Sequence, residues 1–530
     1  MTKRWILSAL MFVPASPALA DWPQWRGPNR DGVAPDAAAL AETWPQKGPP
    51  LVWTSERIPS GGASGYGSVV VADGRVYLLC TPRWDEPITE RVMSRGWQNQ
   101  LGYVAPDRRL PAELDKKVEA ARCSEERAKL RGNQLNDWIK KWTEDNVASE
   151  DDRKKLAPVI AKRLSQGSKA LTWEDLDKVA ALKDKRFADQ AGLDKWLDEC
   201  GFTGDVRKAV AGQFPTTKPM SRNELWCLDA KDGKKLWCKE YPGVPLGYGN
   251  SNTPTVSDGK VYAIGSTTMA FCLDARSGEE VWTYKGRGGE RSSSFLLVDG
   301  KAVAMLGPLT ALDAAKGNVL WKQPKVDAVH QSPIVWTHEG KTYLICNTDR
   351  NVFCVNPDDG AILWQAPGGG WGTPAIDGDR IVVFRGGAKQ LLCYTISPDK
   401  AEKAWSVEVG GDRGASPTIW KGHVYVFQAG RALCVELAEG KVCWDQKVPT
   451  CECGSTVIAD GKMLAVGGGK GFFLTKAAAD KYTPLATSKL AVTDCTTPAV
   501  VAGRMYVRLP NAVGCYDLTP PAPAAAAANP

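Results

Sequence analysis

Histidine is the rarest residue of this 530-residue chain, with three copies, and the signatures of several common protein classes are absent. Three scattered histidines exclude a histidine-rich metal centre, and no Cys-x-x-Cys pair or cysteine–histidine spacing indicates a zinc site. Beyond the N-terminal twenty residues, no stretch of 18 uncharged apolar residues occurs, which excludes a protein with several membrane-spanning helices. The net charge of +7 is small for this length and does not indicate nucleic-acid binding.

Tryptophan and glycine, by contrast, are abundant, with 21 and 52 copies. Hydrophobic residues make up 43% and charged residues 24% of the chain, which is typical of a soluble globular protein. The length is sufficient for two to four ordinary domains or for one large repeat fold.

The N-terminal twenty residues are typical of a secretory signal peptide. Lys3 and Arg4 supply positive charge, residues 5–13 form a short apolar run, and Ala18-Leu19-Ala20 resembles a cleavage site. Because the run is too short to cross a bilayer, we expect cleavage before Asp21 rather than a membrane anchor. The mature protein is therefore expected to be periplasmic or secreted, without a membrane span.

A repeat of about 40 residues organises most of the chain. A tight turn ending in glycine precedes a β-rich stretch eight times: Asp73-Gly74, Asp258-Gly259, Asp299-Gly300, Glu339-Gly340, Asp377-Gly378, Lys421-Gly422, Asp460-Gly461 and Ala502-Gly503. A tryptophan series keeps the same period: Trp237, Trp282, Trp321, Trp364, Trp405 and Trp444. The interval between the first two turns is longer by about 144 residues, which indicates an insertion there.

Each repeat is predicted to form four short antiparallel strands. In one of them, residues 253–257, 260–265, 270–274 and 280–284 are strand-like and alternate with tight turns. Four such strands in about 40 residues make one propeller blade, and blades must stack in a ring to bury both faces. We expect the tryptophans to lie between neighbouring blades, where a large ring buries area and still finds a hydrogen-bond partner.

The ring is predicted to close by joining the two ends of the chain. The last repeat, residues 496–518, supplies only three strands, and residues 51–55 offer a fourth that contains Trp53. Pairing them removes the open sheet edges that promote aggregation. The seventh repeat, residues 454–492, is the most divergent, with Leu485 in place of the tryptophan.

The sequence therefore predicts an all-β fold, an eight-bladed β-propeller with a helical insertion in its first blade. The expected segments are a signal peptide (1–20), a leader with the closing strand and the start of blade one (21–82), the insertion (83–222), the remaining propeller (223–518) and a disordered Pro/Ala tail (519–530).

The insertion differs from the repeats in composition and periodicity. Its 140 residues hold 28 Lys/Arg and 24 Asp/Glu, and its apolar residues follow a helical spacing that predicts five or six helices. One helical run is expected from Leu110 to Leu130, and Ser149 and Thr172 are expected to cap two further helices. Two interpretations are open: a helical cap on the ring with solvated charges, or a module that binds a partner or covers a substrate.

Fifteen cysteines, an odd number in an oxidising compartment, leave at least one unpaired. Six occupy one slot of the repeat and are expected to be small, buried packing residues: Cys227, Cys272, Cys354, Cys393, Cys434 and Cys515. The candidate disulfides are Cys80–Cys227, Cys346–Cys354 and Cys451–Cys453.

Residues 228–237 (LDAKDGKKLW) and 273–282 (LDARSGEEVW) resemble the PQQ-like β-propeller repeat. That repeat builds the eight-bladed propellers of quinoprotein alcohol dehydrogenases and the periplasmic propeller of the outer-membrane β-barrel assembly machinery. Residues 22–32 are similar to the N-terminus of exported propeller proteins of this group. The resemblance covers residues 22–82 and 223–518, and it implies the fold rather than one function, because the repeat occurs in both enzymes and binding proteins.

A quinoprotein dehydrogenase would require calcium ligands, a carboxylate base and cationic partners for the quinone. Many of these enzymes also have adjacent cysteines beside the cofactor, whereas the nearest equivalent here is Cys451-Glu-Cys453. No catalytic residue can be transferred by a motif match, and none of the three histidines lies near a serine-nucleophile signature. We therefore predict no cofactor, with PQQ and Ca²⁺ only under the alternative of a quinone-dependent enzyme.

The residues that lead into the first strand of each blade should approach the central channel at one face. They are Tyr66, Tyr248, Arg291, His330, Trp371, Arg413, Glu452 and Asp494. Either they form a polar, aromatic site for a small molecule, a peptide or a cofactor, or they are ordinary loop residues of which two or three reach the channel mouth. Arg291 and Arg413, three blades apart, would favour an acidic ligand.

The favoured hypothesis is a non-catalytic binding or scaffold protein of the cell envelope. Its partner is expected to be an envelope protein, a peptide or a small acidic ligand, and no nucleic acid. The alternatives are a quinone-dependent oxidoreductase and a hydrolase or lyase that uses carboxylates at the channel mouth.

Overall fold

The chain forms two compact units, which we describe separately. One comprises Met1–Trp84 and Met220–Pro530, and the other comprises Asp85–Pro219. The computed structural model describes residues 21–521 apart from 36, 46, 60–63, 183–184, 248–249, 290–291, 411–413, 429, 450–453 and 468–470. In this part of the chain, no helix has both the length and the apolar character needed to cross a membrane.

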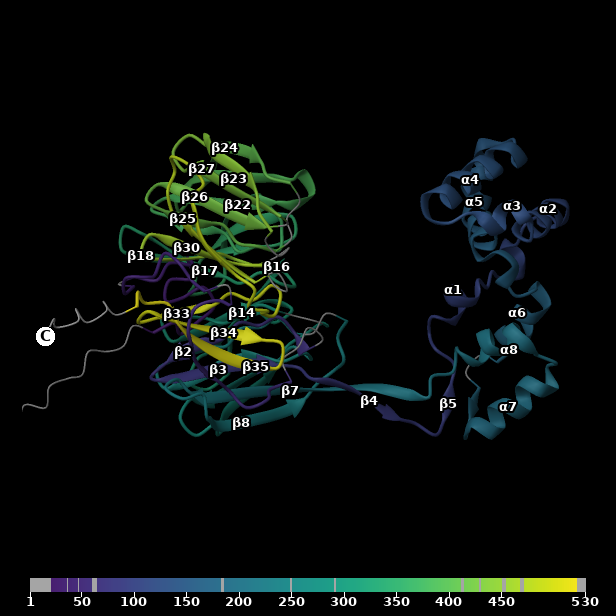
Figure 1. The fold of residues 1–530 in the computed structure, drawn as a ribbon, viewed down its shortest axis with the longest axis horizontal. Coiled ribbons are helices and arrows are strands. Elements are labelled where there is room, and N and C mark those ends of the chain that lie inside the picture. Colours follow the sequence, from purple (N-terminus) through teal and green to yellow (C-terminus); the bar gives the residue numbers. More distant parts are fainter. Residues whose placement is uncertain are drawn as a thin grey trace, which may run out of the picture. The chain divides into compact units, whose positions relative to one another are not determined.

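The larger unit is an eight-bladed β-propeller, as the repeat predicts (Figure 1). Each blade is an antiparallel sheet, and six of the blades are built from four consecutive strands. The first strands of neighbouring blades contact one another, for example β2 with β9, β9 with β13, and β25 with β29. These first strands therefore lie at the centre of the ring.

The blades follow the chain in order. Blade one contains β2 (Val70–Ala72), β3 (Arg75–Cys80), β7 (Thr217–Asp229) and β8 (Lys235–Pro242), with β4 (Arg83–Pro87) also paired to β7; blade two contains β9 (Thr255–Ser257), β10 (Lys260–Ile264), β11 (Met269–Asp274) and β12 (Glu280–Lys285); blade three contains β13 (Leu296–Val298), β14 (Lys301–Met305), β15 (Pro308–Asp313) and β16 (Val319–Asp327); blade four contains β17 (Ile334–His338), β18 (Lys341–Asn347), β19 (Asn351–Val355) and β20 (Ile362–Pro367).

The second half of the ring has the same pattern. Blade five contains β21 (Ala375–Asp377), β22 (Arg380–Arg385), β23 (Gln390–Ile396) and β24 (Ala401–Glu408); blade six contains β25 (Thr418–Trp420), β26 (His423–Gln428), β27 (Arg431–Glu436) and β28 (Val442–Lys447); blade seven contains β29 (Val457–Ala459), β30 (Lys462–Val466), β31 (Phe472–Lys476) and β32 (Pro484–Ser488); blade eight contains β33 (Ala499–Val501), β34 (Arg504–Leu509), β35 (Ala512–Asp517) and β1 (Leu51–Thr54).

Blade eight is made from both ends of the chain, which confirms the predicted closure. β1 pairs antiparallel with β35, with Trp53 opposite Cys515 and Thr54 opposite Gly514. The indole of Trp53 is buried and donates to the carbonyl of Ala230 in blade one. The closing strand therefore links blade eight to blade one.

The turn between the first two strands of a blade requires a left-handed backbone. In blade two, Asp258 has φ 51° and Gly259 has φ 68°. Positive φ at both central residues is typical of a type I′ hairpin, which explains the frequent Asp-Gly pairs of the repeat.

The repeated tryptophans lie between blades, as predicted. Each indole N–H donates across to a backbone carbonyl of the following blade, at 2.8–3.3 Å. The donor–acceptor pairs are Trp53–Ala230, Trp237–Ala275, Trp282–Ala314, Trp321–Pro357, Trp364–Ser397, Trp405–Leu437 and Trp444–Ala478. The same contact therefore repeats at seven junctions between neighbouring blades.

The six cysteines of the repeated slot are buried packing residues, as expected. Burial raises the pKa of Cys227 to about 11, so its thiol is protonated at neutral pH. The proposed disulfides Cys80–Cys227 and Cys346–Cys354 are wrong, because all four cysteines are free. Cys346 lies opposite Phe353, one position away from Cys354, so the two thiols face opposite sides of the sheet.

The smaller unit is mainly helical (Figure 1). Its elements are β5 (Arg91–Val92), α1 (Trp97–Leu101), α2 (Ala112–Arg122), α3 (Glu125–Lys129), α4 (Gly132–Asn146), α5 (Glu150–Gln166), α6 (Trp173–Ala180), β6 (Arg186–Phe187), α7 (Gln190–Glu199) and α8 (Gly204–Ala211), with short 3-10 turns at Pro106–Arg108 and Gly167–Lys169. The helices thus exceed the predicted five or six, and two of them are only five residues long.

Side-chain caps set several of these helix boundaries. Ser149 and Thr172 accept the backbone N–H groups of Asp152 and Asp175, as predicted. The single run expected from 110 to 130 is wrong, because Ser124 caps a new helix, α3, after α2 has ended. The unit has two apolar clusters of its own, one among α2, α4 and α5 and the other around α6, α7 and α8.

Candidate functional site

A ring of hydroxyl side chains surrounds the centre of the propeller. One serine or threonine precedes the first strand of each blade, and all eight are at most 3% exposed. We name this set the hydroxyl belt: Ser68, Thr253, Ser294, Ser332, Thr373, Ser416, Ser455 and Thr497.

Members of the belt bind one another from blade to blade. The backbone N–H of one member donates to the hydroxyl of the next, as from Ser68 to Thr253 at 2.9 Å. The same bond runs from Thr253 to Ser294, Ser294 to Ser332, Thr373 to Ser416, Ser416 to Ser455 and Thr497 to Ser68. The belt therefore fixes the spacing of the first strands around the centre.

A short segment near the N-terminus, residues 22–33, crosses this centre. We name it the leader segment. Trp22 exchanges both backbone hydrogen bonds with Val71 of β2, and the carbonyl of Pro23 accepts from Val256 of β9. At its other end, Gly32 accepts from Ile458 of β29. The leader segment thus binds the first strands of blades one, two and seven.

Two arginines of the leader segment reach the strands on other sides of the ring. Nη2 of Arg26 donates to the carbonyl of Pro417 and the hydroxyl of Thr418 in blade six. The guanidinium of Arg30 donates to the carbonyls of Phe295 and Pro333, in blades three and four. The leader segment is therefore anchored to most of the blades through neutral acceptors.

Four of the eight residues predicted at the channel mouth are described. Tyr66 and His330 are partly buried, whereas Trp371 and Asp494 are exposed. The other four, Tyr248, Arg291, Arg413 and Glu452, lie outside the described residues, as does the candidate pair Cys451–Cys453. Cys495, next to Asp494, takes part in a disulfide bond.

The structure brings two of these mouth residues together. The rings of His330 and Trp371 lie 5.2 Å apart, and Trp371 is 54% exposed. Gln331, which is fully buried, accepts from the N–H of His330 and donates to the carbonyl of Gly370. One amide side chain therefore positions both loops and holds an imidazole beside an exposed indole.

The sequence prediction missed the leader arginines and the hydroxyl belt. The belt did leave a signal, because five of its members directly precede proline at a constant place in the repeat: Thr253, Ser332, Thr373, Ser416 and Thr497. Arg26 and Arg30 occur once each, outside any repeat, and their acceptors in the blades are hundreds of positions away along the chain.

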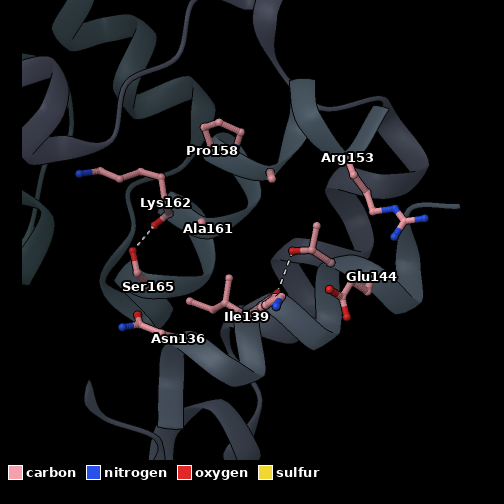
Figure 2. A pocket seen from close by; sticks show the side chains of 11 residues that line it. Asn136, Ile139, Glu144, Arg153, Pro158, Ala161, Lys162 and Ser165 are labelled. Carbon is pink, nitrogen blue, oxygen red and sulfur yellow. Dashed lines mark hydrogen bonds between the residues drawn. The ribbon is translucent and has the colours of Figure 1, made fainter. Parts of the chain in front are cut away.

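A second candidate site lies within the helical unit, between α4 and α5. It is an open groove of about 630 Å³ (Figure 2). Its lining residues are Asn136, Ile139, Lys140, Thr143, Glu144, Arg153, Ala157, Pro158, Ala161, Lys162 and Ser165. Along α5, Ala157, Ala161 and Ser165 are four residues apart, and their small side chains keep the space between the helices open.

The groove has more positive than negative charge at its rim. Lys140, Arg153 and Lys162 contribute cations, and Glu144 contributes the single carboxylate of the lining. Figure 2 shows Arg153 and Lys162 extending to opposite sides of the groove in this view. Nε of Arg153 is buried without a hydrogen-bond acceptor. This arrangement suits an elongated ligand with an apolar face and negative charges.

Comparison with known sequences matches two overlapping stretches of the chain, residues 164–326 and 307–519, to the family described as outer membrane protein assembly factor BamB. Quinoprotein alcohol dehydrogenase PedH of Pseudomonas putida is 26% identical over 219 residues, which are 37% of this chain and 34% of the dehydrogenase. Tetrathionate hydrolase of Acidithiobacillus ferrooxidans is 24% identical over 207 residues, 38% of each chain.

BamB of Yersinia pestis is 25% identical over 157 residues, 27% of this chain and 39% of that protein. The alignments thus span between a third and two fifths of these curated relatives. Among solved structures, BamB from Moraxella catarrhalis has a TM-score of 0.45 and 14% identity, over 56% of this chain and 88% of that chain. With the eight blades and the repeated motif, the sequence match shows that the chain belongs to the PQQ-like-repeat propeller family described as outer membrane protein assembly factor BamB.

Proposed function

We propose that this protein is a non-catalytic binding or scaffold protein of the cell envelope. Its groove between α4 and α5 binds an acidic, amphipathic helical segment of an envelope protein. The observation that carries the proposal is the cation-rimmed groove, because it is a preformed surface in a unit inserted into the propeller.

The dimensions and chemistry of the groove favour a helix as the bound segment. Its α5 wall runs from Arg153 to Ser165, about 18 Å at the helical rise of ~1.5 Å per residue. A partner helix of about three turns would fill that length, with its apolar face on Ile139, Pro158 and Ala161. Carboxylates on the flanks of that helix would meet the cations of the rim, which adds specificity and faster association.

The comparisons support the class of partner. The family and one relative carry the name of an outer membrane protein assembly factor, so a partner among envelope proteins is consistent with this kinship. The signal-peptide-like N-terminus supports export of the chain to the compartment in which such partners occur.

The channel mouth is proposed as a second contact, for a small acidic ligand or a peptide. The pair of His330 and Trp371, whose rings are tilted against each other with centroids 5.2 Å apart, supports this role, because an exposed indole held beside an imidazole offers an aromatic binding face. Tyr66 and Asp494 belong to the same proposed set, together with Tyr248, Arg291, Arg413 and Glu452.

The dehydrogenase relatives raise the question of a quinone cofactor with calcium. Calcium takes six to eight oxygen ligands, largely from carboxylates and carbonyls. Among the mouth residues that the structure describes, the one carboxylate is that of Asp494, which is exposed, and the described part of the chain holds no cluster of potential metal ligands. We therefore derive no reaction through a quinone.

Site-specific photo-crosslinking in intact cells tests the proposed function. A photoreactive residue at Lys162, in the groove, is expected to capture an envelope protein through an acidic helical segment identified by mass spectrometry. The matched control is Lys155, an exposed residue of the same helix outside the groove, which should give no such adduct.

Two outcomes would contradict the proposal. One is an equal yield of adducts at Lys162 and Lys155, or adducts that map to segments without acidic helices. The other is reduction of an electron-acceptor dye by the purified protein with an alcohol, added quinone and Ca²⁺, which would instead establish the oxidoreductase alternative.

A further inference from the structure

The repeated cysteines lie opposite a β-bulge in the outer strand of their blade. In blade six, Cys434 of β27 faces Trp444 of β28, whereas the next residue, Val435, faces Val442. Cys443 is therefore the extra residue of the bulge. Because a bulge places two residues of one strand opposite one residue of its partner, Cys443 and Trp444 both lie opposite Cys434.

Blade six differs from the other blades of this kind in the residue at the bulge. The same bulge lies opposite Cys227, Cys272, Cys354, Cys393 and Cys515. The extra residues there are aliphatic, in the same order Leu236, Val281, Leu363, Ala404 and Val52. Among these six bulges, all of them in the described part of the chain, two cysteines meet in blade six alone.

The geometry of the pair in blade six suits a disulfide. Cys434 is 0% exposed, its thiol is hydrogen-bonded to that of Cys443, and both cysteines are free in this structure. Facing residues of antiparallel strands have Cα atoms about 4.5–5.5 Å apart, within the ~4.4–6.8 Å that a disulfide spans. Nε and Nη2 of Arg431 in β27 donate to the two carboxylate oxygens of Asp445 in β28. The two strands therefore already lie in the pairing that the disulfide requires.

We propose that Cys434 and Cys443 form a redox-controlled disulfide that links the last two strands of blade six. Such bonds persist in oxidising compartments, and the signal-peptide-like N-terminus indicates such a compartment for this chain. The bond would lie beside Trp444, whose indole donates to the carbonyl of Ala478 in blade seven. Since blade seven has Leu485 in place of its own tryptophan, the disulfide would stabilise the ring next to its most divergent blade. The proposal is independent of the groove in the helical unit.

The oxidant is a disulfide, either of a small molecule or of a thiol–disulfide oxidoreductase. Cys443 is the partly exposed thiol, so its thiolate attacks the oxidant, forms a mixed disulfide and releases one thiolate. Burial and the neighbouring Cys443 raise the pKa of Cys434, which therefore reacts second. Its thiol loses a proton and attacks the sulfur of Cys443, and the second thiolate leaves. Two electrons thus pass from the two cysteines to the oxidant, whose two sulfur atoms take up the two protons.

Peptide mapping of the full chain tests the proposal, because trypsin cleaves between the two cysteines at Lys441. The protein is treated with oxidised glutathione, and the remaining thiols are alkylated in denaturant. Residues 432–441 and 442–447 are then expected as one disulfide-linked pair, lighter by two hydrogen atoms than the separate peptides. Oxidation should also raise Tm by about 2–5 °C, because the bond restricts the unfolded chain.

Two controls distinguish this pair from the other thiols. Cys443→Val restores the aliphatic residue of the other blades, so the protein should fold but lose the linked peptides and the rise in Tm. Cys272, which faces the same bulge with Val281 as the extra residue, should be alkylated in the oxidised sample of the unaltered protein. The proposal is overturned if Cys434 and Cys443 are both alkylated after oxidation, if either is linked to a different cysteine, or if Cys443→Val keeps the full rise in Tm.

Discussion

At the scale of single residues, glycines have two separate roles in the blade turns. Gly278 has φ +74°, and an added Cβ would lie 2.7 Å from the ring of Trp237. Gly259 has a similar φ of +68°, but no atom lies within 4 Å of its would-be Cβ. The first glycine is therefore required by backbone conformation and by tryptophan packing, and the second by conformation alone.

This pair of positions separates the two effects experimentally. Gly259→Ala is expected to destabilise the propeller by about 1–2 kcal/mol, the cost of a left-handed alanine. Gly278→Ala should cost a further ~1–3 kcal/mol, because the ring of Trp237 must move out of a packed interface. Unfolding midpoints in guanidinium chloride measure the difference, and equal midpoints for the two variants would contradict the packing role.

Residue-level features were predictable where they repeat and not where they occur once. The turn glycines, the tryptophans and the buried cysteines recur with the period of the blade, so their shared environment follows from the fold. The predicted disulfide between Cys346 and Cys354 is wrong. The spacing of two residues along a hairpin does not show which side of the sheet each side chain faces, and these two face opposite sides. Arg26 gave no signal, because its burial depends on how the leader segment crosses the ring.

At the scale of elements, β1 and the leader segment hold the ring together. β1 supplies the outer strand of blade eight, and its Trp53 reaches blade one. The leader segment adds backbone bonds to β2, β9 and β29 at the centre. The closing strand was predictable from a missing fourth strand, whereas the leader segment has no strand pattern from which its path could be read.

Deletion of residues 21–58 from the mature chain removes both elements. The expected result is a lower Tm and association, because β35 would become an unpaired edge strand. Size-exclusion chromatography with light scattering and a thermal melt measure both effects. A truncated protein that stays monomeric with the Tm of the full chain would show that neither element is needed for closure.

At the scale of the whole molecule, the helical unit is an insertion between paired strands. β3 and β7 lie in register from Arg75 opposite Asp229 to Cys80 opposite Glu224, and the N–H of Arg222 reaches the carbonyl of Pro82. The chain thus leaves blade one and returns at adjacent positions. The apolar clusters of the helical unit draw on its own residues, so its core forms within residues 85–219.

This arrangement predicts that each unit folds without the other. Replacement of residues 84–221 by a short glycine-containing turn connects two strands that already pair, so the propeller should keep its β-rich circular dichroism spectrum and cooperative unfolding. Residues 85–219 expressed alone should be helical, because α2, α4 and α5 bury their apolar side chains on one another. Loss of the β-rich spectrum in the first protein would show instead that blade one requires the inserted helices, and the groove could then no longer be treated as the property of an independent unit.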